Sequence, residues 1–135
     1  MSNPTLSIVI PTYNEKDNIL KILEKLKKAL NSITPEIIFV DDNSPDGTSA
    51  VIKNCMKNSS KLRLIHRIGR KGLAGAVIEG VFAANADLVA VMDCDLQHDE
   101  TKLLDMINLF SKNTSLDIVI GSRFTETGEI SEKAF

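Results

Sequence analysis

Short apolar runs alternate with amphipathic stretches along almost the whole of this 135-residue chain. Residues 6–11 and 36–41 have the length and character of buried strands, whereas residues 19–30 repeat apolar side chains at helical spacing, with lysines and glutamates between them. Strands that alternate with helices in this way are typical of βαβ units on a mostly parallel sheet. The alternation therefore predicts an α/β fold.

The same pattern predicts the individual elements. The expected strands are residues 6–11, 36–41, 62–66, 88–92 and 117–121. The expected helices are one capped by Asn14, one from about Thr48, and two over residues 73–84 and 101–110. Pro45 and Gly47 predict a turn, because proline fixes φ and glycine accepts a positive φ. A chain of this length buries one core, so residues 1–135 are expected to form a single domain.

Composition excludes several classes of function. A net charge of -2 argues against a nucleic-acid-binding surface, so we expect no nucleic-acid partner. The first ten residues lack the basic start of a secretory signal, and no run approaches the roughly 18 apolar residues of a membrane span. These features predict a cytoplasmic protein. Cys55 and Cys94 match neither a metal nor a disulfide spacing, and both are expected to be reduced.

Two aspartates follow the fourth expected strand directly. Asp93 and Asp95 are two residues apart, so in a strand their side chains point to the same face. Such close carboxylates repel one another, and a hard divalent cation relieves the repulsion and can bridge to a phosphate. Aspartates also end strands simply as turn formers, which is the simpler interpretation of the pair.

Polar segments follow the other expected strands as well, and ligands of open α/β sheets bind outside the carboxyl ends of the strands. No Gly-x-Gly-x-x-Gly follows the first strand, and the chain has no P-loop motif. Any phosphate would therefore be held by a metal and by side chains.

Five ordered motifs cover nearly the whole chain: Ser7-Ile-Val-Ile-Pro-Thr-Tyr-Asn-Glu15, Val40-Asp-Asp-Asn-Ser-Pro-Asp-Gly-Thr48, Arg70-Lys-Gly-Leu-Ala-Gly-Ala76, Met92-Asp-Cys-Asp-Leu-Gln-His98 and Ile118-Val-Ile-Gly-Ser-Arg-Phe124. Together they resemble the dolichyl-phosphate mannosyltransferase-like inverting glycosyltransferases. The resemblance implies the Rossmann-like three-layer sandwich of the GT-A fold. It also implies transfer of mannose or glucose from a donor of the GDP-mannose or UDP-glucose type to a polyprenyl phosphate, with Mg²⁺ or Mn²⁺, by a peripheral protein at the cytosolic face of a membrane.

The resemblance assigns nucleotide-sugar binding to nine residues: Pro11, Tyr13, Glu15, Val40, Asp42, Asp93, Cys94, Asp95 and Arg123. The first three would hold the nucleoside, the next two would contact the base and ribose region, and the last four would lie along the phosphates. Asp93, Asp95 and Gln97 would ligate the metal. Asp95 and Arg123 are the expected catalytic residues, because a cation and an arginine stabilise the charge that develops on the departing phosphate.

Several of these residues also have a simpler structural interpretation. Tyr13 could be a half-buried packing residue, and at least one of Asp41 and Asp42 is expected to be a turn residue. His98 is expected to form a structural hydrogen bond beside the metal-binding loop. Three cations are expected to form a solvated rim that could also steer anionic substrates inward: Arg67, Arg70 and Lys71.

The chain also departs from the family pattern. Family members usually have His-Pro-Pro where this chain has His98-Asp99-Glu100, and the chain ends at Phe135, before the family's acceptor-side C-terminal portion. We therefore expect self-association or a completing partner chain. The alternative function is a non-catalytic nucleotide-sugar-binding or interaction module left by loss of the acceptor half. An aspartyl phosphatase fits poorly, because its Asp-x-Asp pair normally follows the first strand.

Overall fold

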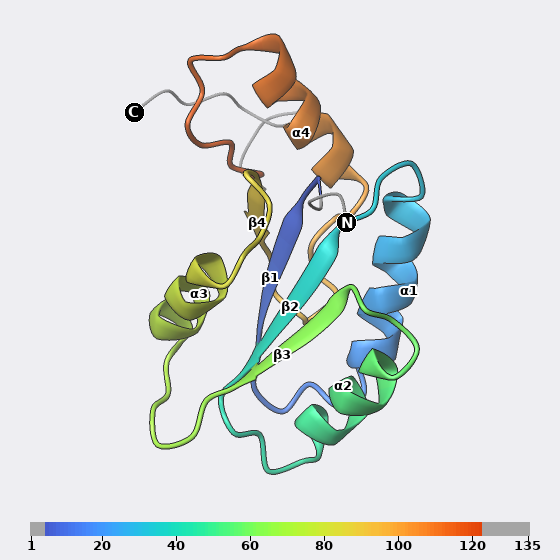
Figure 1. Cartoon of the computed structure of the whole chain (residues 1–135), viewed down its shortest axis with the longest axis vertical. Helices are drawn as coiled ribbons and strands as arrows, with labels where there is room; N and C mark the ends of the chain where they lie inside the picture. The colour runs from blue at the N-terminus through green and yellow to red at the C-terminus, as the bar shows by residue number, and fades with distance from the viewer. Residues whose placement is uncertain (1–4, 123–135) are drawn as a thin grey trace. The chain divides into compact units, whose positions relative to one another are not determined.

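A computed structural model describes residues 5–122, and the chain divides into two compact units, Met1–His98 and Asp99–Phe135. The first unit is built on a four-stranded sheet in the order β3-β2-β1-β4 (Figure 1). Its strands are β1 (Ser7–Thr12), β2 (Glu36–Asp41), β3 (Leu62–His66) and β4 (Val89–Val91), and every pairing is parallel. The predicted α/β class with a parallel sheet is confirmed, whereas the single domain stays a prediction.

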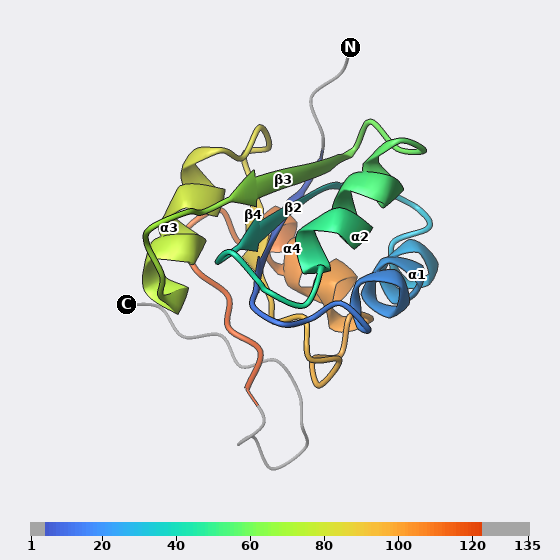
Figure 2. The ribbon, with the colours of Figure 1, turned by 90° about the horizontal axis from the view of Figure 1, so that it is seen from below.

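Helices cover both faces of this sheet. α1 (Ile19–Ala29) and α2 (Thr48–Met56) lie on one face, and α3 (Leu73–Phe82) lies on the other (Figure 2). α1 carries its buried apolar side chains at helical spacing, as the sequence predicts. The second unit contains α4 (Lys102–Lys112). No helix within residues 5–122 has the length and apolar character needed to cross a bilayer.

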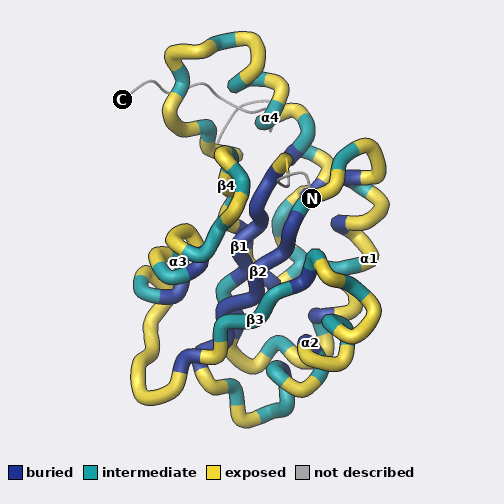
Figure 3. The backbone as a smooth tube through the Cα atoms, in the orientation of Figure 1, coloured by how far each residue is buried: buried dark blue, intermediate teal, exposed yellow. Residues whose placement is uncertain are grey.

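The core lies on both sides of β1 and β2, the most buried strands of the sheet (Figure 3). Val9, Ile38 and Val40 face Ala76 of α3. The neighbouring side chains in each strand point to the opposite face, because strand residues alternate. Gly80 lets α3 approach the sheet closely, since a Cβ atom there would overlap Val9 and lie 3.1 Å from Cγ2 of Val40.

The strand order places one reversal of the chain between β1 and β4. The first three strands are added outward in the order β1, β2, β3, whereas β4 returns to the other side of β1. Ligands of open α/β sheets bind outside the carboxyl ends of the strands at such a reversal. The loops after β1 and β4 are therefore where a ligand is expected.

A buried glutamate holds the opposite, amino end of the sheet together. Glu36, at the start of β2, accepts hydrogen bonds from Ser7 Oγ at 2.5 Å, from Asn85 N at 2.6 Å and from Asn85 Nδ2 at 2.9 Å. Arg63 Nη1 of β3 lies 3.2 Å from the same carboxylate. Burial alone would raise the pKa of Glu36, but these hydrogen bonds outweigh it and hold the pKa below its usual value. The glutamate thereby ties three strands to the segment after α3.

Two predicted features of the elements are wrong. Asn14 does not cap a helix, because its φ is 57° and α1 begins only at Ile19. Residues 117–121 do not form a strand, since within the described residues only Ile120 makes an isolated bridge. Their β-forming side chains are not sufficient, because a strand is defined by a run of paired backbone groups. The bounds predicted for β2 and β3 are confirmed.

Candidate functional site

The loop after β1 is fastened to the turn after β2. Three consecutive backbone N–H groups donate to three side chains of that turn: Asn14 to Ser44 Oγ at 2.9 Å, Glu15 to Thr48 Oγ1 at 3.0 Å and Lys16 to Asp46 Oδ2 at 3.1 Å. Gly47 has a φ of 95°, which confirms the predicted turn chemistry. The turn motif therefore fixes the path of residues 13–16.

Asp41 is the residue that shapes this turn. Its buried carboxylate accepts hydrogen bonds from Ser44 N at 3.1 Å, Ser44 Oγ at 2.5 Å and Ser49 Oγ at 2.7 Å. Thr12 Oγ1 at the end of β1 donates to the same group at 3.3 Å. Asp41 is thus the turn residue of the Asp41-Asp42 pair.

Asp42 is paired with a buried arginine. Asp42 Oδ1 lies 2.5 Å from Arg67 Nη1, and its Oδ2 accepts the Gly72 N–H at 2.7 Å. Arg67 also donates to the Gly72 carbonyl at 3.0 Å and to Glu79 Oε1 at 3.2 Å. The predicted place of Arg67 in a solvated rim is wrong, since only 3% of the residue is exposed. Its planar fork of donors satisfies several partners at once, which makes its burial tolerable.

The other two cations of the expected rim differ from Arg67. Arg70 is exposed and donates to both oxygens of Glu79, at 2.7 and 2.8 Å, which lowers the pKa of Glu79 to about 2. Lys71 is exposed, and its Nζ lies 5.0 Å from the centre of the Tyr13 ring. Gly75 leaves room for the buried guanidinium of Arg67, because a Cβ atom there would lie 2.6 Å from Arg67 Nη2.

Tyr13 lies in the loop after β1 and is 48% exposed. About half of the residue is therefore covered, so both the half-buried packing interpretation and a binding role stay predictions. Its ring lies at the carboxyl end of the sheet, with the Lys71 ammonium over one face. An exposed ring of this kind can stack on a planar group.

The acidic motif after β4 has the alternation that its sequence predicts. Asp93 and Asp95 are exposed, and Cys94 between them is 1% exposed. Burial raises the pKa of the Cys94 thiol to about 12, helped by the carboxylates of Glu15 and Asp95. β4 pairs in parallel with β1, and Met92 N donates to the Val9 carbonyl at 3.1 Å, so the loops after these two strands leave the sheet side by side. Cys55 and Cys94 are both free thiols, as predicted.

The acidic motif continues into a turn whose backbone is strained. Leu96 has a φ of 63°, which is unfavourable for a branched side chain, and Gln97 N donates to Asp95 Oδ1 at 3.0 Å. His98 Nε2 lies 3.4 Å from Asp93 Oδ2, consistent with the structural role predicted for this histidine. Asn14 and Asn43 also have positive φ, so each loop after β1, β2 and β4 contains one non-glycine residue of this kind.

The donor groups of this motif suit a hard divalent cation. Asp93, Asp95 and Gln97 are all exposed and offer carboxylate and amide oxygens, which Mg²⁺ and Mn²⁺ prefer. Residues 5–122 contain no group of three or more histidine, cysteine or acidic residues placed to hold a metal. The predicted metal ligands, Asp93, Asp95 and Gln97, are not a group of that type, because the third ligand is an amide.

The remaining predicted residues lie in different environments. Pro11 is half-buried and pairs in register with Val40 across β1 and β2. The Val40 side chain is buried in the core under α3. Arg123 lies outside the described residues, so its predicted role is not addressed by the structure. Sequence reasoning missed Lys71 as a neighbour of Tyr13, and no motif spacing indicated that contact.

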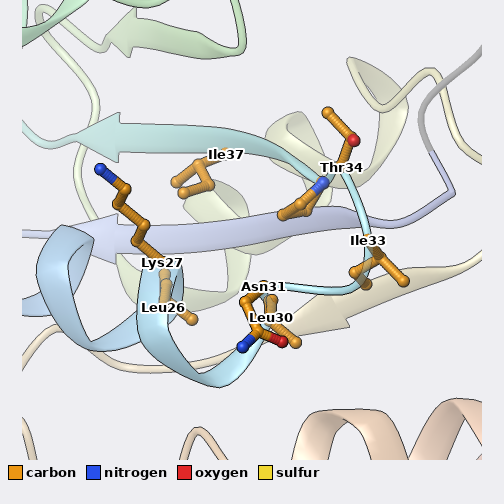
Figure 4. Close-up of a pocket in the computed structure, with 8 residues that line it drawn as sticks. Leu26, Lys27, Leu30, Asn31, Ile33, Thr34 and Ile37 are labelled. Atoms are coloured by element: carbon orange, nitrogen blue, oxygen red, sulfur yellow. The ribbon is translucent and has the colours of Figure 1, made fainter.

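A hollow of about 320 Å³ lies elsewhere in the first unit (Figure 4). It is lined by residues at the end of α1 and before β2, among them Leu30, Ile33 and Ile37, and it includes one charged side chain, Lys27. Because β2 begins at Glu36, this hollow lies at the amino end of the strand, opposite the loops described above. The hollow is therefore separate from the candidate site.

Comparison with known proteins gives the family and the fold of the chain. The dolichol-phosphate mannosyltransferase of Pyrococcus furiosus is 39% identical over 132 residues, which cover 96% of this chain and 36% of that protein. A Pyrobaculum calidifontis mannosyltransferase solved with GDP-Man and Mn²⁺ has a TM-score of 0.72 at 22% identity, covering 86% of this chain and 34% of that chain.

A Mycobacterium tuberculosis glucosyl-3-phosphoglycerate synthase solved with Mn²⁺, UDP and glucosyl-3-phosphoglycerate has a TM-score of 0.59 at 22% identity, covering 76% of this chain and 38% of that chain. The chain thus spans little more than a third of the length of these relatives. Residues 7–134 match glycosyl transferase family 2. The parallel sheet with helices on both faces has the GT-A fold that these structural neighbours share. The chain belongs to glycosyltransferase family 2.

Proposed function

We propose that this chain is the donor-binding part of a glycosyltransferase that moves mannose or glucose from a nucleoside diphosphate sugar to a polyprenyl phosphate. One observation carries the proposal: the exposed Asp93 and Asp95 follow β4, and the loop of Tyr13 and Glu15 follows β1, which is paired with β4 at the reversal of the chain. The names of the relatives support both the donor and the acceptor class.

The nucleoside would lie along the loops after β1 and β2. Tyr13 offers an exposed ring, and Glu15 is held by its backbone to Thr48 while its carboxylate accepts Asn18 Nδ2 at 2.7 Å. Pro11 and Val40 are paired across β1 and β2, and they would set the positions from which the two loops leave the sheet. Because both oxygens of Asp42 are engaged by Arg67 and Gly72, we propose that Asp42 supports the nucleoside region chiefly by positioning residues 67–72.

The diphosphate would lie along residues 93–95. Asp93, Asp95 and Gln97 would hold Mg²⁺ or Mn²⁺, and we propose Arg123 as a further cation facing the phosphates. When bound, such a cation neutralises charge on the diphosphate. The buried Cys94 would pack beneath this segment and not act as a nucleophile, since its high pKa keeps the thiol protonated. Asp95 would contribute by fixing the Gln97 backbone as well as by its charge.

The acceptor phosphate needs no general base from this chain. A phosphate monoester is largely ionised at pH 7, so it is already a nucleophile. Attack on the anomeric carbon would form the new glycosyl–phosphate bond and release the nucleoside diphosphate. We further propose that this occurs at the cytosolic face of a membrane, with self-association or a second chain completing the acceptor side.

A second candidate function is a nucleotide-sugar-binding module without turnover. It is favoured by the position of the candidate site, which lies in the loops after β1, β2 and β4 and would contact the donor. Such a module would keep the loops after β1, β2 and β4 and bind the donor without transferring its sugar.

Release of nucleoside diphosphate separates the two candidates. The chain is incubated with GDP-mannose or UDP-glucose and Mn²⁺, with and without a polyprenyl phosphate in vesicles, and free GDP or UDP is measured. The transferase predicts release that depends on the lipid phosphate and is lost in Asp95→Asn. Tight donor binding with no lipid-dependent release would support the binding module instead.

A further inference from the structure

Residues 67–72 connect β3 to α3 and reach across the end of β2 to the loop after β1. Asp42, which follows β2, binds this segment at both ends, through Arg67 Nη1 at 2.5 Å and Gly72 N at 2.7 Å. Lys71 within the segment lies over Tyr13, with its Nζ 5.0 Å from the ring centre. We call residues 67–72 the bridging segment.

The bridging segment is anchored by a buried charge. Arg67 is almost fully buried and also bonds the Gly72 carbonyl and Glu79. Removing one partner of a buried ion pair is strongly unfavourable, so these contacts hold the ends of the segment in place. The exposed Lys71 side chain is thereby presented at the Tyr13 ring on a fixed backbone.

The strand order gives the direction in which a nucleotide would lie. The acidic motif follows β4, Tyr13 follows β1 and Asp42 follows β2, and these strands are adjacent in that order. Neighbouring strands are about 4.8 Å apart, so a nucleoside diphosphate spans more than one of them. With its diphosphate at Asp93 and Asp95, its base would point toward Tyr13 and the bridging segment.

We propose that Lys71 selects the base of the bound nucleotide, favouring guanine and uracil over adenine and cytosine. An ammonium group has three donors and no acceptor. Guanine O6 and the equivalent O4 of uracil are acceptors, whereas adenine and cytosine present amino donors there. Stacking on Tyr13 tolerates every base, and a weak cation–π contact lets the ammonium turn from the ring to a base edge. This inference rests on the proposed function.

Calorimetric titration with GDP, UDP, ADP and CDP in Mn²⁺ tests the proposal. Wild type should bind GDP or UDP at least about tenfold more tightly than both ADP and CDP, the discrimination expected of a good donor–acceptor contact. Lys71→Met should reduce that preference to within about twofold, by weakening the favoured nucleotide. Lys57→Met removes an equal charge from an exposed site after α2 and should leave the preference unchanged.

A second readout follows the ring itself. The chain has one tyrosine and no tryptophan, so an NMR label on tyrosine reports Tyr13 alone. Lys71→Met should shift this signal in the free protein, and Lys57→Met should not. Unchanged base preference in Lys71→Met, or a wild type that binds all four nucleotides alike, would overturn the inference and leave the proposed function standing. Failure of wild type to bind any of the four would overturn both.

Discussion

Replacing Thr48 with valine tests whether the turn after β2 supports the candidate site. Thr48 is fully buried, accepts the Glu15 N–H at 3.0 Å and donates to Asp46 Oδ1 at 2.6 Å. Valine has nearly the same shape and is also β-branched, so Thr48→Val removes both hydrogen bonds without opening a cavity.

The structure gives the size of the expected effect. A hydrogen bond to a charged group contributes about 1.5–3 kcal/mol and a neutral one about 0.5–1.5 kcal/mol, so the two together are worth roughly 2–4 kcal/mol. That is a large part of the 5–15 kcal/mol by which domains are usually stable. The Thr48 hydroxyl is also the main cause that lowers the pKa of Asp46, so this pKa should rise toward its usual value in the variant.

Urea unfolding followed by circular dichroism measures the stability, and NMR titration measures the pKa of Asp46. Thr34→Val is the matched control, because Thr34 is exposed and lies at the other end of the sheet. GDP binding in Mn²⁺ should also weaken in Thr48→Val, since the Glu15 backbone loses its anchor. If the two variants unfold within about 0.5 kcal/mol of each other, the turn does not support the site as we describe.

Three further predictions concern the metal, the helix packing and the pH dependence. Asp95→Ala should weaken GDP binding strongly in Mn²⁺ and hardly at all in EDTA, and equal weakening in calorimetry would exclude a metal bridge. Gly80→Ala should lower the free energy of unfolding by about 1–2 kcal/mol in urea titrations, because overpacking against Val9 exceeds the gain in helix propensity; combined with Val9→Ala it should cost less than the sum of the two single changes, because the smaller side chain relieves the overlap. Glu36→Gln should cost about 1.5–3 kcal/mol at pH 7. Because the folded pKa of Glu36 is depressed, its contribution is complete above the usual value of 4.5 and is lost as pH falls below it, so wild type and variant should converge in acid; a difference that does not shrink there would contradict the assignment.

The sequence predicts the scaffold well, because hydrophobic periodicity reports burial directly. The bounds of β2 and β3 follow from their apolar runs. The predicted alternation of exposed Asp93 and Asp95 around buried Cys94 is also present, although these residues lie beyond the end of β4. Residues 117–121 show the limit of that reasoning, since their composition favours a strand but pairing depends on a neighbour.

The contacts of charged groups could not be predicted in the same way. Arg67 and Glu36 are buried because of partners that are 25 and 49 residues distant in the chain, Asp42 and Asn85, and sequence spacing carries no sign of them. Asn14 has the identity of a helix cap but serves instead as a left-handed turn residue, a role asparagine also accepts. The positive φ of Leu96 has no sequence signal at all.

We propose above all that the loops after β1 and β4 bind a nucleoside diphosphate and a divalent cation together. Titration of the chain with GDP and with UDP, each in Mn²⁺ and in EDTA, tests it most directly. We predict that at least one nucleotide binds at least about tenfold more tightly in Mn²⁺, because the diphosphate completes the coordination that Asp93, Asp95 and Gln97 supply only in part. Equal affinity in Mn²⁺ and EDTA, or no binding of either nucleotide, would contradict the claim.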